Sequence, residues 1–501
     1  MCTQSKGATT QGDLDRRETA IIGTNWRLAA RSVIALGVAG AAGLSLTSPA
    51  AAATAPNNSW IWDTTQTQLA SAAWTIGADA VWSRGVTGTG IGVALVDTGV
   101  SRVPGLDGSN IVYGPDLSFE SQDATLRYQD DFGHGTHLAG IIAGKNTVSA
   151  DGFSGIAPGV KLTSIKVGVA NGAVDVSQTI AAIDWAVENR NADPSNPIRV
   201  INLAYGTPST QDYRVDPLAF AVENAWRKGI VVVAAAGNTG QTGRLTDPAT
   251  DPYVIAVGAA DTKNTPDGTD DTVASFSSRG TSARTPDVVA PGRTIASLRD
   301  PGSYVDTNFS GARRGSRFFV GSGSSQASAM VSGAVALMLQ ARPSLTPDAV
   351  KNLIKKTARP VKTSVALDNG IGMLNVWDAY QYVIPSVTQT WTRATGTGSL
   401  EKARGGVHVV DNGVVLSGEN DIFGPFNSAT WASATAGGTA WDGGKWLGRD
   451  MTGTTWTTSG GAKAWSGRTW SGRTWSGRTW SGRTWSGNTW SGLTWDGAAW
   501  I

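Results

Sequence analysis

The chain has 501 residues and a formal net charge of +2, a balance that gives no reason to expect a nucleic-acid partner. Its length suffices for one large domain with accessory segments, and a hydrophobic fraction of 40% suffices for an extensive core. Cys2 is the only cysteine, which excludes disulfides within the chain and thiolate metal sites. Core packing, aided at most by bound ions, must therefore hold the fold together.

Residues 1–53 have the composition of a signal peptide. Arg27 and Arg31 precede an apolar run from 33 to 46, and small residues follow through Ala53. A basic flank, a short apolar stretch and an Ala-x-Ala site are typical of a secretory signal. The run is too short and too rich in glycine for a stable membrane span. We therefore expect cleavage after Ala53 and a secreted protein, either extracellular or associated with the cell surface.

Residues 54–384 alternate between apolar strands and amphipathic helices. The predicted strands are 91–96, 162–167, 198–203, 230–235 and 253–257, and the clearest predicted helices are 176–189 and 217–227. Near-continuous apolar strands separated by helices favour an α/β fold, in which helices cover both faces of a mostly parallel sheet. The functional groups of such a fold are expected at the carboxyl ends of the strands.

Two further segments follow this domain. Residues 385–426 are predicted to be a linker, rich in Thr and Gly, with a short β segment. Residues 427–501 are predicted to be a tail of Trp-Ser-Gly-Arg-Thr repeats, in which tryptophan recurs at every fifth position from 465 to 500. The looser members of this tryptophan series are Trp431, Trp441, Trp446 and Trp456.

The tryptophan tail has three interpretations. It is a mobile segment in which arginines pack over indole faces, or a module that binds a cell-envelope polymer, since exposed indoles suit stacking on sugars. The third interpretation is a regular β-structure with a turn at each Ser-Gly, because a period of five on one straight strand would alternate faces. Composition alone leaves all three open.

Three short motifs carry the residue types that acyl transfer to a serine requires. Asp97 ends an apolar strand, His134 opens a helix of small residues, and Ser325 lies at the start of an apolar helix. A serine nucleophile needs a base within hydrogen-bond reach and a carboxylate that fixes the imidazole tautomer. A fourth segment, Ala-Ala-Gly-Asn ending at Asn238, offers a side-chain donor for an oxyanion.

These motifs resemble the signatures of the subtilisin-like serine peptidases, the subtilases. Asp-Thr-Gly, His-Gly-Thr-His and Gly-Ser-Ser-x-Ala occur in the order of that family, and the tail is similar to the Trp-rich tails of its secreted actinobacterial members. The resemblance covers residues 75–382 and implies a serine endopeptidase that acts through an acyl-enzyme. It implies that Asp97 orients His134, that His134 is the general base and acid, and that Ser325 is the nucleophile. Asn238 and the Ser325 N–H would form the oxyanion hole.

The resemblance also implies a substrate cleft and its ligands. Two edges would pair with the substrate backbone as added strands, and three small residues would leave room for an apolar side chain before the scissile bond. The first edge is Gly172, Ala173 and Val174, the second is Ala204, Tyr205 and Gly206, and the small residues are Ala235, Ala236 and Gly237. The implied partners are protein or peptide substrates. Catalysis needs no cofactor; structural calcium is common in the family, but no acidic loop is specific enough to name its ligands.

The sequence departs from the family pattern at several positions. Gln326 and Ala204 stand where methionine and serine are common, so substrate preference is less well defined than activity. Barely twenty residues separate the predicted cleavage site from the first family-like segment at Trp74, which leaves no room for the folding propeptide of many relatives. We expect folding help from elsewhere, and the C-terminal region is a candidate.

Other readings of the motifs are weaker. The nucleophile elbow of α/β-hydrolases also resembles the segment around Ser325, but that family places its acid and histidine after the serine, and only His408 follows. His137, one helical turn after His134, is expected to pack rather than react. The remaining alternative is a wall-associated binding protein that has kept the peptidase fold without its activity.

Overall fold

The computed structural model describes residues 68–451, apart from 146–152, 241–243, 266–267, 364, 366–370, 384–385 and 412–413. The predicted signal peptide, Trp456 and the strict tryptophan repeat from 465 to 500 lie outside the described residues. Within the described part of the chain, no helix has both the length and the apolar character needed to cross a membrane.

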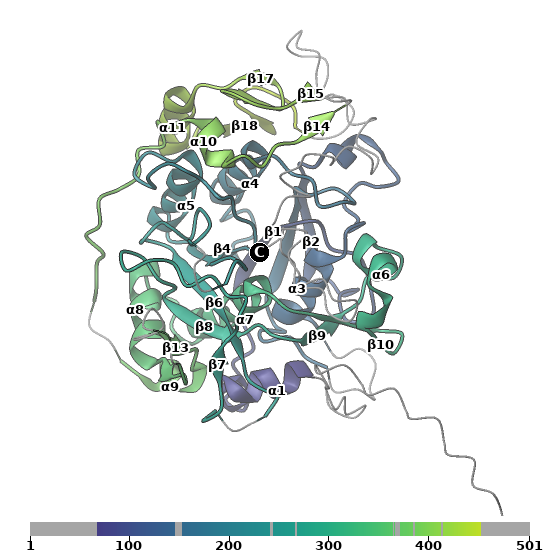
Figure 1. The fold of residues 1–501 in the computed structure, drawn as a ribbon, viewed down its shortest axis with the longest axis vertical. Helices are drawn as coiled ribbons and strands as arrows, with labels where there is room; N and C mark the ends of the chain where they lie inside the picture. The colour runs from purple at the N-terminus through teal and green to yellow at the C-terminus, as the bar shows by residue number, and fades with distance from the viewer. Residues whose placement is uncertain are drawn as a thin grey trace, which may run out of the picture. The chain divides into compact units, whose positions relative to one another are not determined.

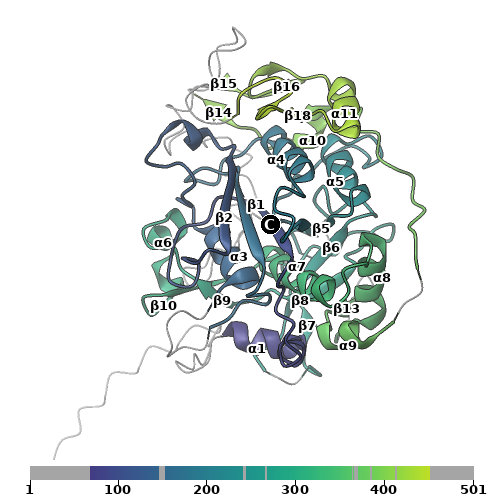
Figure 2. The same cartoon turned by 180° about the vertical axis from the view of Figure 1, so that it is seen from behind.

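A sheet of ten described strands lies at the centre, and helices cover both of its faces (Figures 1 and 2). The main path runs β12-β13-β8-β6-β5-β4-β1-β3-β2, with β7 paired to β6. From β2 to β13 all neighbours on this path are parallel. The strands are β1 (Gly92–Asp97), β2 (Ile111–Asp116), β3 (Lys161–Lys166), β4 (Ile198–Leu203), β5 (Val231–Ala235), β6 (Ile255–Asp261), β7 (Thr272–Val273), β8 (Val288–Pro291), β12 (Arg359–Pro360) and β13 (Gly372–Met373). The predicted α/β class is confirmed.

Helices and a small second sheet surround this layer. A three-stranded sheet consists of β9 (Ile295–Leu298), β10 (Arg313–Arg314) and β11 (Phe318–Gly321). The helices up to residue 381 are α1 (Gln68–Thr75), α2 (Ala78–Trp82), α3 (His134–Ala143), α4 (Val176–Glu188), α5 (Pro217–Arg227), α6 (Tyr304–Asn308), α7 (Ser324–Ala341), α8 (Pro347–Thr357) and α9 (Val376–Gln381), with short 3-10 turns at Phe119–Gln122 and Ser310–Ala312. Helices α3 and α7 pack against each other, as do α4 and α5.

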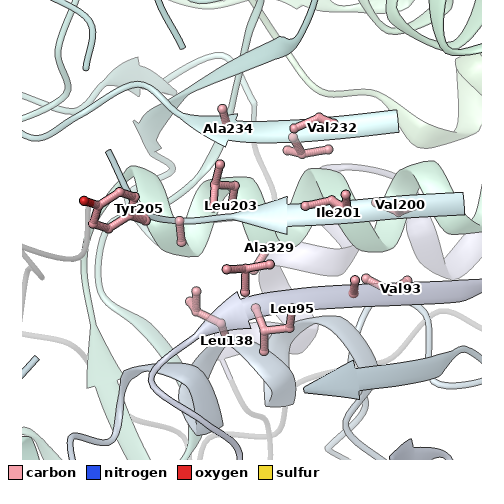
Figure 3. Close-up of a cluster of buried hydrophobic side chains, with 14 of the residues drawn as sticks. Val93, Leu95, Leu138, Val200, Ile201, Leu203, Tyr205, Val232, Ala234 and Ala329 are labelled. Atoms are coloured by element: carbon pink, nitrogen blue, oxygen red, sulfur yellow. The ribbon is translucent and has the colours of Figure 1, made fainter. Parts of the chain in front are cut away.

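The core explains why β1 and β5 are almost wholly apolar. β1 and β5 are buried at every residue, because helices cover both sides of a parallel sheet. Figure 3 shows β5, β4 and β1 side by side, with Leu138 of α3 and Ala329 of α7 close to Leu95. The small residues of α7 allow this close packing: a Cβ added at Gly333 would lie 2.7 Å from Ile156 Cβ.

The chain after residue 386 packs against the domain, which differs from the predicted linker. Residues 386–398 run as an extended segment along the surface (Figure 1). Then follow α10 (Leu400–Arg404), the pairs β14–β15 (Val410–Asp411, Val414–Val415) and β16–β17 (Asn420–Asp421, Gly424–Pro425), α11 (Ser428–Gly437) and β18–β19 (Trp441–Asp442, Lys445–Trp446). We call residues 399–451 the C-terminal layer. The predicted boundary between linker and tail, at 426/427, falls within this layer.

Three tryptophans attach the C-terminal layer to α4. Trp431 and Trp446 each donate Nε1–H to Asp184 Oδ2 at 2.9 Å, and Thr435 Oγ1 donates to Asp184 Oδ1 at 3.1 Å. The Trp441 Nε1–H donates to the carbonyl oxygen of Ala181 at 2.8 Å. All three indoles are buried, and a buried indole with a satisfied N–H combines a large apolar contact with a directional one. These looser members of the tryptophan series are therefore core residues.

The Asp184 carboxylate should make stability depend on pH. Burial raises its pKa to about 6, against the hydrogen bonds from Trp446, Trp431 and Thr435, which lower it. An acid whose pKa is higher folded than unfolded binds extra protons on folding, so its contribution to stability is full below about pH 4 and is lost as the pH rises through about 6. We expect the protein to lose about 3 kcal/mol relative to Asp184→Asn between pH 4 and pH 7. Urea unfolding of both, in a Ser325→Ala background that prevents self-digestion, measures the difference; pH profiles that run parallel contradict it.

Candidate active site

The predicted site residues gather at one edge of the sheet. The neighbouring strands β3, β1, β4 and β5 are parallel, with Asp97 opposite Lys166, Val96 opposite Leu203, and Leu203 opposite Ala234. Because parallel neighbours end at the same edge, the segments that follow these strands lie together. Asp97 and Ala235 are the last residues of β1 and β5, and the segments that follow the strands contain Asn238, both predicted cleft edges and the other two small residues.

Asp97 and His134 form a direct hydrogen bond. His134 Nδ1 lies 2.7 Å from Asp97 Oδ1, and both side chains are buried. The same carboxylate oxygen accepts the Thr98 N–H at 2.8 Å. A ring that donates from Nδ1 to a carboxylate presents Nε2 as its basic nitrogen, which is the tautomer that a general base towards serine requires.

The start of α3 is fixed by two residues that the sequence analysis did not single out. Asp130 accepts the Gly133 N–H and the Thr136 N–H, both at 2.7 Å, and the Thr98 hydroxyl at 2.6 Å. Thr98 Oγ1 accepts the Gly135 N–H at 3.0 Å. Asp130 and Thr98 therefore set the position of His134 relative to Asp97. An acid a few residues before a helix start is a recognisable capping signal.

The glycine after His134 permits this approach of α3 to β1. A Cβ added at Gly135 would lie 2.0 Å from the carbonyl oxygen of Gly99, closer than any real side-chain contact. The backbone of the helix start thus passes directly over the Asp-Thr-Gly turn. Gly135 is therefore required by the close approach of the two backbones, whereas Gly99 has a φ of +115° and a Cβ there would lie 2.6 Å from the Gln129 carbonyl oxygen.

Ser325 lies in the first turn of α7, beside Asn238. Asn238 Oδ1 accepts the Ser324 N–H at 2.9 Å, and Ser324 Oγ accepts the Gly237 N–H at 3.1 Å, so the Gly-Asn turn and the helix start form one unit. Ser325 Oγ is buried and makes no hydrogen bond to another described residue. N–H groups in a first helical turn lack acceptors within the helix, and the helix dipole favours negative charge there.

The starts of α3 and α7 converge on Gly321, at the end of β11. A Cβ added there would lie 2.9 Å from Gln326 Nε2 and 3.1 Å from His137 Cε1; Gln326 follows Ser325, and His137 is one turn beyond His134. His137 Nε2 lies 3.1 Å from the Phe319 carbonyl oxygen, and burial lowers the His137 pKa to about 3. A neutral, buried ring agrees with the prediction that His137 packs rather than reacts.

A buried ion pair supports the first predicted cleft edge. Lys166, the last residue of β3, donates Nζ–H to Glu120 Oε2 at 2.7 Å, and Glu120 Oε1 accepts the Ala170 N–H at 2.8 Å. The turn that follows is closed by the Gly172 N–H, which donates to the Val169 carbonyl at 2.7 Å. Sequence analysis did not identify this pair, because its members are 46 residues apart.

The second predicted edge, residues 204–206, follows β4 directly. Tyr205 lies beyond the end of that strand (Figure 3) and is 2% exposed. Its hydroxyl group faces Thr179 and Asp175 of the α4 start, and burial raises its pKa. The Tyr205 side chain thus packs under α4. At the end of β5, Gly237 has a φ of +110°, and a Cβ there would lie 2.8 Å from Ser278 Oγ.

Within the described residues, no group of three or more His, Cys, Asp or Glu side chains is placed to hold a metal ion. No residue is therefore assigned to calcium.

Comparison with known proteins adds to this geometry. The Subtilase family profile matches residues 88–390, more than half of the chain. Serine protease AprX of Bacillus subtilis (strain 168) is 38% identical over 296 residues, which cover 58% of this chain and 66% of that protein. Subtilisin Savinase of Lederbergia lenta is 36% identical over 300 residues, 60% of this chain and 93% of that protein. A match to the crystal structure of a cold adapted subtilisin-like serine proteinase covers 58% of this chain and 90% of that chain, with 27% sequence identity and a TM-score of 0.44.

The match spans all the motifs described above, from the Asp97 strand to the α7 helix. The regions outside it are the N-terminal residues and the chain beyond residue 390, which includes the C-terminal layer. On the extent of the family match, this chain belongs to the subtilase family of subtilisin-like serine endopeptidases.

Proposed function

We propose that the protein is a secreted endopeptidase that cleaves peptide bonds through an acyl-enzyme at Ser325. His134 takes the Ser325 proton through Nε2 and gives it to the leaving amine, while Asp97 fixes the tautomer and stabilises the imidazolium. The Ser325 N–H and the Asn238 side chain donate to the oxyanion. The observation that carries this proposal is the 2.7 Å contact between Asp97 Oδ1 and His134 Nδ1, at the sheet edge where α7 presents Ser325.

The substrate part of the proposal rests on the two cleft edges. An extended peptide lies between residues 172–174 and 204–206 and pairs with their backbones as an added strand. The small residues Ala235, Ala236 and Gly237 leave space for an apolar side chain before the scissile bond. No cofactor takes part in these steps.

Labelling with a serine-directed phosphonate tests the proposal. The protein from residue 54 onward should hydrolyse casein and take up one phosphonate, which mass spectrometry of proteolytic fragments locates at Ser325. Ser325→Ala should stay folded by circular dichroism and take up no label. A folded wild-type protein without label or casein hydrolysis contradicts the enzyme and supports the binding protein instead.

Secretion and the tail belong to the same proposal. Residues 1–53 export the protein, and the repeats from 465 to 500 bind a cell-envelope polymer through their indoles. Because Trp431, Trp441 and Trp446 are core residues, the deletion that tests the tail must begin at residue 452. Loss of cell-wall retention in that deletion supports envelope binding; unchanged retention supports a mobile or self-packed tail.

A further inference from the structure

We infer that Arg404 of the C-terminal layer is a positioning residue for the substrate cleft, because its helix α10 contacts the residue that follows each cleft edge. This inference rests on the proposed function, which supplies the two edges. It assigns a part in substrate binding to a segment beyond the family match at residues 88–390.

Arg404 uses its whole guanidinium in buried contacts. Its Nε–H donates to Asp175 Oδ2 at 2.6 Å, and its Nη1–H donates to the Gly418 carbonyl at 2.7 Å. Its Nη2–H donates to the Asn420 carbonyl oxygen. The side chains of Arg404 and Asp175 both have an exposed fraction of 0%. A planar guanidinium that donates hydrogen bonds from all three of its nitrogens fixes the direction of its partners as well as their distance.

Asp175 is the residue directly after the first cleft edge. It is also the N-cap of α4: its Oδ1 accepts the Ser177 N–H at 3.0 Å, and its own N–H donates to Gln178 Oε1 at 2.8 Å. The edge 172–174 is thus attached at its far end to α4 through Asp175. Arg404 neutralises and orients that carboxylate from the side of the layer.

Thr207 is the residue directly after the second cleft edge. Its Oγ1–H donates to the carbonyl oxygen of Ala403 at 2.5 Å, and its N–H donates to the Asp247 carbonyl at 2.9 Å. The chain then passes tightly against α10: a Cβ added at Gly405, whose φ is +64°, would lie 2.3 Å from the Pro208 carbonyl carbon. Two consecutive residues of α10, Ala403 and Arg404, therefore contact the residues that directly follow the two edges.

The spacing of the cleft depends on this bridge. A peptide that pairs with both edges needs them at a fixed separation, since backbone hydrogen bonds tolerate little change in length. A small ester that reaches only Ser325 needs neither edge. Loss of the guanidinium leaves the Asp175 carboxylate without its buried partner, so it moves towards water and takes the end of the first edge with it. The expected effect is therefore specific to extended substrates.

The test compares Arg404→Met with the wild type on two substrates. For a tetrapeptide p-nitroanilide we expect KM to rise about tenfold, as for the loss of about 1.4 kcal/mol of binding, while kcat stays within about twofold. For p-nitrophenyl acetate we expect kcat/KM to stay within about twofold. Arg404→Lys keeps the positive charge but loses the planar guanidinium, so it should give a smaller rise in the peptide KM. Phosphonate titration counts the active sites in every preparation.

Two further variants complete the design. Trp446→Phe is the matched control, because it removes another donor to a buried aspartate of α4, Asp184, without contact to either edge; it should lower Tm and leave both KM values unchanged. Thr207→Val removes only the contact to Ala403 and replaces Arg404→Met if that variant does not fold; it should also raise the peptide KM.

The inference is overturned if the peptide KM does not change, if ester and peptide rates fall together, or if Trp446→Phe gives the same rise. Failure of the proposed function is distinct, since the wild type would then take up no phosphonate.

Discussion

We expect Ser325→Ala and His134→Ala each to lower kcat for peptide hydrolysis by a factor on the order of 10⁶, and the double variant to lose no more than either single one. The reason is that the hydroxyl and the imidazole act in one step: without the base the nucleophile stays protonated, and without the nucleophile the base has nothing to deprotonate. Asp97→Asn lowers kcat by about 10⁴, because an amide at the 2.7 Å contact with Nδ1 favours the wrong imidazole tautomer. Steady-state rates on a chromogenic tetrapeptide measure all four variants.

His137→Asn is the control for these rates. The His137 ring is neutral and contacts the Phe319 carbonyl, so its replacement should lower Tm and retain phosphonate labelling of Ser325. The triad assignment fails if His137→Asn abolishes labelling while His134→Ala retains it. It also fails if the losses in the Ser325→Ala, His134→Ala double variant multiply, because independent groups would give that result.

We expect that a chain that ends at residue 398 does not fold to a stable state. Removal of the C-terminal layer uncovers the outer side of α4 and leaves Asp175 without Arg404. Loss of one buried aromatic side chain costs about 3–5 kcal/mol, and Trp431, Trp441 and Trp446 are all buried against the domain. Three such losses amount to about 9–15 kcal/mol, which is comparable to the total stability of a typical domain, about 5–15 kcal/mol. Near-ultraviolet circular dichroism and calorimetry, on the Ser325→Ala background, should show no cooperative transition.

The matched control is a chain that ends at residue 451. This truncation keeps every contact named for the C-terminal layer, so it should unfold cooperatively with a Tm close to that of the full chain. If the chain ending at 398 unfolds with the same Tm, the layer is an accessory segment and its packing contributes little. The same pair of proteins tests the expectation that the C-terminal region helps the domain to fold.

Much of the domain follows from local sequence patterns. β4 and α5 have the predicted bounds 198–203 and 217–227, since the strand is rich in Ile, Val and Leu, interrupted only by Arg199 and Asn202, and the helix has a capping Asp216 followed by proline at its start. The predicted strand 253–257 begins two residues later, at Ile255, because the cap-like turn at Asp251 uses the Tyr253 N–H. The pairing of Asp97 with His134 was predicted by the resemblance to the subtilases and not by strand order, because His134 opens a helix and does not end a strand.

The packing of the C-terminal layer could not be predicted from local sequence patterns. Its strands are two residues long, too short for any hydrophobic period to be visible. The partner that makes Trp431 and Trp446 core residues is Asp184, 247 and 262 residues away. Their spacing in the chain matches the repeat that follows, so the sequence grouped them with it. The contacts of Thr98 with Asp130 and Gly135 join residues 32 and 37 positions apart, whereas Asp130 contacts the α3 start over only three and six positions.

The extent of the C-terminal layer limits how far the repeats can lie from the enzyme. If 385–464 were all connector, eighty residues of chain would separate domain and repeats. Because 399–451 is part of the body, only residues 452–464 remain before Trp465, and thirteen residues fully extended span about 45 Å. A polymer bound at Trp465 would therefore lie within about one domain diameter of the α4 side of the protein, whatever conformation residues 452–464 adopt.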